Sequence, residues 1–114
     1  FVSVIAPFPG NHNGKAVATF DRLELQRILD LYGRMVAAGH WRDYAMHFDR
    51  DLASFAAFRR AAERPDVRIE KRPSLRAKQG VWALVGEHGV VLKRGHELQP
   101  VLAPLERRLI RLVD

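Results

Sequence analysis

Val67–Arg94, which reads VRIEKRPSLRAKQGVWALVGEHGVVLKR, is the stretch that decides the fold of this chain. It contains three short segments of β character, separated by a loop around Pro73 and a turn at residues 86–89. Pro73 ends the first segment because proline cannot donate a hydrogen bond to a strand ladder. Residues 81–85 are apolar on both faces, which is typical of a central strand covered on both sides. The stretch therefore predicts the middle of an antiparallel sheet.

The same stretch holds most of the positive charge. Its net charge is +5, out of +6 for the whole chain. Cationic side chains gathered on one surface neutralise phosphates and release counterions, and a neighbouring tryptophan can stack on a base. The candidate nucleic-acid-binding residues are Arg68, Lys71, Arg72, Arg76, Lys78, Trp82, Lys93 and Arg94. The alternative is that the cations are solvated strand residues, some paired with Glu70, and that Trp82 packs in the core.

A helix is predicted before the sheet, over residues 22–38. Asp21 is a suitable N-cap, and Glu24 three residues later completes a pattern similar to a capping box. Gly39 stands where a left-handed C-cap belongs. One apolar stripe at helical spacing consists of Leu25, Ile28, Leu29, Tyr32, Met35 and Val36.

The remaining elements are predicted from changes in the spacing of apolar residues along the chain. Residues 41–48 alternate as a strand, and residues 16–20 predict a short strand entering the domain. Residues 52–60 fit both a helix and a strand, and we favour a strand because both neighbours read as extended. Residues 61–66 predict a loop or wide hairpin. A final apolar stripe from Leu98 predicts a helix with a kink or restart at Pro104.

These elements predict an α+β fold, a four- or five-stranded antiparallel meander flanked by an N-terminal and a C-terminal helix. Residues 15–114 form a single domain and residues 1–14 an N-terminal arm or linker. The apolar residues 1–8 are too few to span a bilayer, so no transmembrane segment is expected. Without cysteine, neither a disulfide nor a thiolate zinc site supports the fold. A homodimer or the arm would cover the second face of the doubly apolar strand.

Several strings resemble a small bacterial family catalogued only as a domain of unknown function. They are FDRLELQRILDLYGRMVAAGHWRDYA, FRRA, RIEKRP, KQG, LKRGHEL and RLIRLV, and the similarity covers about Thr19 to Val113. The string around residues 31–35 is the most specific part. The resemblance implies a small intracellular bacterial protein, and it implies no activity, cofactor or catalytic residue.

The sequence leads us to expect a non-enzymatic basic binding module that contacts a polyanion, most simply nucleic acid, in the cytoplasm. One alternative is a homodimeric accessory subunit that binds proteins, with an acidic protein as a further partner. Another is a small enzyme with a pocket between helix and sheet that uses Tyr32, Arg34, Asp43 or His47. The five histidines show no compact metal-ligand spacing. No catalytic residue, metal or cofactor is assigned.

Overall fold

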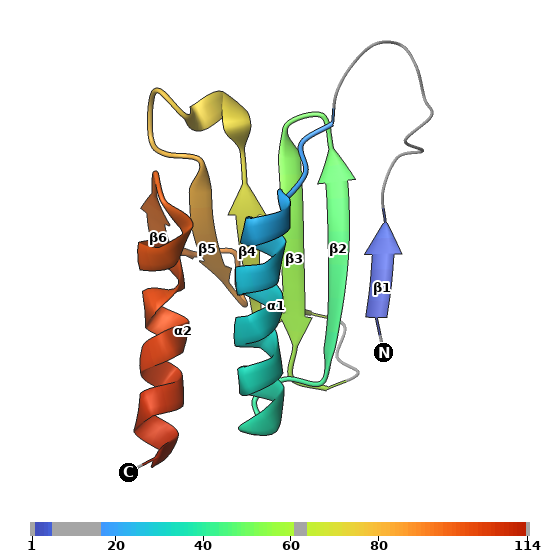
Figure 1. Cartoon of the computed structure of the whole chain (residues 1–114), viewed down its shortest axis with the longest axis vertical. Helices are drawn as coiled ribbons and strands as arrows, with labels where there is room; N and C mark the ends of the chain where they lie inside the picture. Colours follow the sequence, from blue (N-terminus) through green and yellow to red (C-terminus); the bar gives the residue numbers. More distant parts are fainter. Residues whose placement is uncertain (1, 6–16, 61–63, 114) are drawn as a thin grey trace.

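The computed structural model describes residues 2–5, 17–60 and 64–113, and it has two layers. A six-stranded sheet of order β1-β2-β3-β4-β5-β6 forms one layer, and two helices lie together on one face of it (Figure 1). Strands β2 to β6 are a five-stranded antiparallel meander, with α1 before it and α2 after it. This confirms the predicted α+β fold.

The strands are short and lie side by side in sequence order; tight turns join β2 to β3 and β5 to β6, and longer loops join β3 to β4 and β4 to β5. Their bounds are β1 (Val2–Ile5), β2 (Asp43–Asp49), β3 (Leu52–Phe58), β4 (Val67–Lys71), β5 (Trp82–Gly86) and β6 (Val91–Gly95), with a 3-10 turn η1 (Pro73–Leu75) after β4. The strand interpretation of residues 52–60 is confirmed. Strand β1, within the expected arm, pairs in parallel with β2 and adds a sixth strand at that edge. The rest of the arm, residues 1 and 6–14, lies outside the described residues.

Helix α1 (Arg22–Ala37) has the caps that its sequence predicts. The backbone N–H of Glu24 donates to the Asp21 carboxylate, and the Glu24 carboxylate accepts from the backbone N–H of Asp21, each at 2.8 Å. At the other end Gly39 has φ +85°, and the N–H of His40 donates to the carbonyl of Met35. This arrangement satisfies carbonyls that the helix end leaves free.

Helix α2 (Leu98–Val113) is continuous through Pro104, so the restart expected there is wrong. A proline removes one backbone hydrogen bond, and burial of Val101, Leu102 and Leu105 against the sheet offsets that loss. The short strand expected at residues 16–20 is also wrong for residues 17–20, which are irregular. A hydrogen bond from the Ala18 N–H to the carbonyl of Asp49 connects these residues to the end of β2. Residue 16 and residues 61–63 of the predicted loop lie outside the described part.

The core lies between the sheet and the helices. Side chains that alternate along the strands fill it, among them Phe55, Ile69 and Leu84, which are paired across β3, β4 and β5 and are no more than 1% exposed. Tyr32 of α1 packs edge-on against Phe55 and Tyr44. Because side chains alternate, the intervening residues of each strand point to the other side of the sheet.

Candidate functional site: the open face of the sheet

We call the surface of the sheet that faces away from α1 and α2 the open face; Figure 1 shows both helices on the opposite side. Strand register places two cross-strand rows on it, one of Ala45, Ala56, Arg68, Val85 and Val91 and one of His47, Ser54, Glu70, Ala83 and Arg94. Arg72 continues the alternation of β4 on the same side, and its N–H donates to the carbonyl of Val81. The middle of the open face thus combines small side chains with three arginines on the β4–β6 side, and the ends of β2 and β3 add Asp43, Asp49, Leu52 and Phe58.

Glu70 organises two of these arginines. Its Oε2 atom lies 3.2 Å from Nε of Arg68, and its Oε1 atom lies 3.8 Å from Nε of Arg72. The Glu70 side chain is 12% exposed, whereas those of Arg68 and Arg72 are 35% and 39% exposed. Arg94 is half-buried on β6 and has no acidic partner among the described residues. Glu70 therefore pairs with two of the three arginines, while the other carboxylates of this face, Asp43 and Asp49, lie on β2.

Three of the residues predicted to bind nucleic acid, Trp82, Lys71 and Lys93, lie on the helix side instead, and the first two make contacts there. Trp82 is 4% exposed and stacks on Phe20 with ring centroids 6.0 Å apart, so its ring is not available to a base. Lys71 donates from Nζ to Glu24 at 2.6 Å and to the carbonyl of Thr19 at 2.9 Å. Both side chains hold the start of α1 against the sheet. The alternative interpretation of Trp82, a core residue, describes its position.

The other predicted cations lie outside the open face. Arg76 and Lys78 are exposed in the loop after η1, at the end of the sheet where β4 finishes. Asp51, in the turn between β2 and β3, fixes that loop by accepting from the backbone N–H and the hydroxyl of Ser74. Those two hydrogen bonds lower the pKa of Asp51. Lys93 is exposed on β6, on the helix side.

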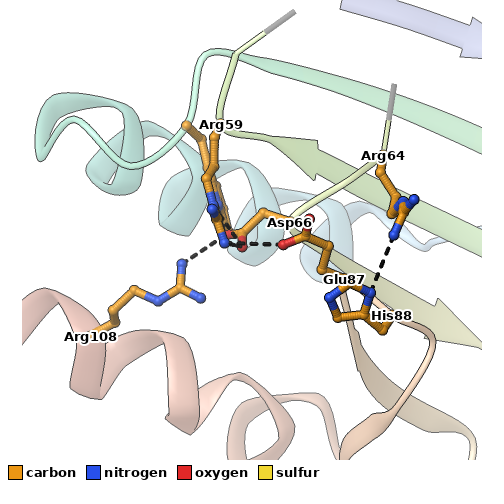
Figure 2. Close-up of polar contacts among 7 residues, drawn as sticks. Arg59, Arg64, Asp66, Glu87, His88 and Arg108 are labelled. Carbon is orange, nitrogen blue, oxygen red and sulfur yellow. Dashed lines mark hydrogen bonds and ion pairs between the residues drawn. The ribbon is translucent and has the colours of Figure 1, made fainter. Parts of the chain in front are cut away.

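A second group of charged residues, which sequence reasoning did not identify, occupies the opposite end of the sheet (Figure 2). Its centre is Asp66, which directly precedes β4 and whose side chain is 4% exposed. Asp66 accepts from Nε1 of Trp41 and from Nη1 of Arg108, each at 2.8 Å, and from Arg59 at 3.0 Å. Arg59 also lies 3.3 Å from Glu87 at the β5–β6 turn.

The environment of Asp66 holds it in the ionised form. Burial alone would raise the pKa of this carboxyl, but hydrogen bonds from Arg108, Trp41 and Arg59 outweigh burial and lower it. Figure 2 also shows Arg64 beside the ring of His88, with 3.2 Å between the Arg64 Nη1 and the His88 Nδ1. These contacts join the strand ends, α2 and the β5–β6 turn. Asp66 and Glu87 thereby compensate part of the positive charge at this end.

The residues proposed for a small enzyme do not form one cluster. Tyr32 lies on the helix side, where burial and then the charge of Asp43 raise its pKa. Arg34 points to α2 and pairs with Glu106 at 2.9 Å, while His47 belongs to the open face. Within the described residues, no group of three or more His, Asp or Glu side chains is arranged to hold a metal ion.

The doubly apolar strand β5 is covered on both sides in the single chain. Ala83 and Val85 point to the open face, yet they are only 2% and 3% exposed. They lie between the longer side chains of β4 and β6: Arg68 faces Val85, and Glu70 and Arg94 flank Ala83. Long side chains cover small neighbours with their aliphatic parts. Burial of these two residues therefore does not require a second copy of the chain.

Fold and site together define an α+β domain in which both helices cover one face of the sheet, while no helix of the described residues covers the other, arginine-bearing face. The chain belongs to the family DUF2794, described as a protein of unknown function, whose profile matches residues 18–102. This confirms the resemblance found in the sequence, although the match ends before most of α2. No curated protein and no solved structure matches the chain. Neither of the two helices in the described ranges is long and apolar enough to cross a membrane.

Proposed function

We propose that this protein binds nucleic acid through the open face, with Arg68, Arg72 and Arg94 contacting phosphates. The observation that carries the proposal is the arginine cluster on the β4–β6 side of that face, where Arg68 and Arg72 share Glu70 and Arg94 has no acidic partner among the described residues. Exposed cations neutralise phosphates and release the counterions condensed on them, which is the main source of sequence-independent affinity.

Two features of the open face suit this role. Glu70 contacts Arg68 and Arg72 through their Nε atoms, which leaves the terminal nitrogens of both guanidinium groups free to donate to phosphate oxygens. The side chains of Ala45, Ser54 and Ala56 are short and project little from the sheet. A nucleic-acid backbone can therefore approach the strands beside the arginines.

The burial of Trp82 determines the kind of binding to expect. Since its ring stacks on Phe20 in the core, base stacking on this tryptophan does not contribute. Affinity then comes from phosphate contacts, and binding should depend steeply on salt and little on sequence.

A fluorescence anisotropy titration tests the proposal. Labelled single-stranded RNA, single-stranded DNA and duplex DNA are titrated with the full chain at about 50 mM and about 200 mM salt. Replacing both Arg68 and Arg94 by glutamine should reduce the slope of log K against log salt by about 1.4 for single strands and about 1.8 for duplex. Arg107→Gln is the matched control, because Arg107 is exposed on α2 in the helix layer.

Any of three outcomes would overturn the proposal. The first is no binding at the lower salt concentration. The second is a slope that the double variant leaves unchanged, and the third is a slope that Arg107→Gln reduces as much as the double variant does. Circular dichroism spectra of all variants establish that the substitutions leave the fold intact.

A further inference from the structure

Strand β6 is an edge strand. It pairs with β5 on one side, and within the described residues no strand pairs with its other side (Figure 1). Backbone N–H and C=O groups on such a side are free to pair with another extended segment. The free edge is therefore a potential interaction surface built from the main chain.

The side chains along this edge are unusually apolar. Val90, Val91 and Leu92 are consecutive and are 61%, 45% and 49% exposed. Soluble proteins commonly expose single apolar residues, whereas a contiguous run at a sheet edge marks a contact surface. An added strand would bury part of this run.

A bulge in the β5–β6 ladder determines to which face of the sheet each side chain of the edge points. Val91 pairs with Val85 and Lys93 with Leu84, so Leu92 is the extra residue of a bulge. Val91 consequently points to the open face and Lys93 to the helix side. Leu92 is also on the helix side, because a Cβ added at Gly86 would lie 3.4 Å from it. A bound strand would meet apolar contacts on both faces and a cation on one.

Symmetry disfavours a second copy of this chain as the occupant. In an antiparallel dimer with its two-fold axis through the middle of β6, all five residues of the strand pair with the other copy. Lys93 then lies directly opposite the Lys93 of that copy. Like charges in that position repel. Moving the axis toward Val91 separates the lysines, but the overlap then extends beyond the start of β6 into the turn, and fewer residues of β6 pair with each other. The edge therefore selects a strand with an acidic residue at the position that faces Lys93.

We propose that the free edge of β6 binds an extended, acidic segment of another protein as an added β-strand. Main-chain hydrogen bonds supply general affinity, apolar side chains of the segment cover Val91 and Leu92, and a carboxylate pairs with Lys93. Lys93 has no acidic partner within the described residues. The inference is independent of nucleic-acid binding, because the Lys93 side chain is on the helix side of the sheet.

The test uses the full chain and three synthetic peptides. One alternates glutamate with valine, the second alternates lysine with valine, and the third is the acidic peptide with a central proline that interrupts main-chain pairing. Amide chemical shifts and hydrogen exchange are measured by NMR across the chain. The acidic peptide should shift the amides of residues 91–95 and protect those that do not bond to β5. The basic peptide and the proline peptide should bind more weakly.

Charge reversal at one position gives the sharper result. Lys93→Glu should weaken the acidic peptide about two- to five-fold and strengthen the basic peptide by a similar factor, as expected for one cross-strand charge pair. Arg50→Glu, which makes the same charge change at the β2–β3 turn, should alter neither. The proposal is overturned by equal affinity for the acidic and basic peptides, by tight binding of the proline peptide, or by shifts away from β6. Protection of β6 that grows with protein concentration and without peptide would assign the edge to self-association instead.

Discussion

Replacing Asp66 should cause a large loss in the free energy of unfolding for the few atoms that are removed. Asp66→Ala leaves the buried Nε1–H of Trp41 without an acceptor, which costs about 1–3 kcal/mol. It also removes the charge-assisted hydrogen bond of Arg108, whose side chain is 34% exposed. The pair with Arg59, 63% exposed, adds less than about 1 kcal/mol. Because such terms do not add fully, we expect a loss of about 3–5 kcal/mol in the free energy of unfolding.

Asp66→Asn is the matched control, because it keeps the shape and one oxygen. The amide oxygen can still accept from Trp41 and Arg108, and the amide nitrogen then faces the mostly solvated Arg59. We expect this variant to lose about 1–2 kcal/mol. Urea unfolding at neutral pH, followed by far-ultraviolet circular dichroism, measures both losses. A cost below about 1 kcal/mol for Asp66→Ala, or a larger cost for Asp66→Asn, would refute the assignment of Asp66 as a buried acceptor.

The pH dependence tests the charge separately. The pKa of Asp66 in the folded chain is lower than its ordinary value of 3.8, so the folded state favours the ionised form more than the unfolded state does. Asp66 then contributes stability at neutral pH, and this contribution declines as the pH falls below about 5 toward the lowered pKa. The difference in stability between the wild type and Asp66→Asn should shrink over the same interval. A difference that stays constant down to pH 3 would contradict the electrostatic explanation.

Four further predictions concern other elements. Gly33→Ala should raise the free energy of unfolding by about 0.5–1 kcal/mol, because nothing lies within 4 Å of the added Cβ on α1. Gly80→Ala should lower it, since Gly80 has φ +100° and its Cβ would meet neighbouring backbone; urea unfolding measures both, and equal effects would contradict the distinction. Lys71→Met should lower the unfolding temperature in a thermal scan yet leave nucleic-acid affinity unchanged, because Lys71 is on the helix side; an affinity loss matching that of the arginine variants would place Lys71 at the binding face. Ser74→Ala should raise the pKa of Asp51 toward its ordinary value in a carboxyl NMR titration, and an unchanged pKa would show that Ser74 does not cause the shift.

Local patterns in the sequence were sufficient for most elements of the fold. The capping box at Asp21 and the left-handed Gly39 bound α1 within one residue of its predicted end, because caps depend on neighbouring groups alone. Alternation identified β4, and a run of residues that is apolar on both faces identified β5, because both patterns depend on neighbouring residues. Pro104 predicted a kink or restart, yet α2 continues through it without a restart. Burial of α2 against the core offsets the single lost hydrogen bond.

The candidate site was only partly predictable. Alternation along β4 correctly separates Arg68 and Arg72 from Val67 and Ile69, but a count of charges along the chain also includes Lys71, which belongs to the other face. Position along a strand determines the face of each side chain. It does not determine which residues of other strands lie opposite.

The sequence by itself determined most of the helices and the strands of the meander, the alternation along β4, and that the chain is basic, because these properties depend on composition and on residues a few positions apart. Only the tertiary structure decided the rest. It placed both helices on one face, brought Arg94 across β5 toward Arg68 and Arg72, buried Trp82 against Phe20, and gathered Arg59, Trp41 and Arg108 around Asp66. Register and layer packing join residues far apart in the chain, and the free energy that fixes them comes from the whole core.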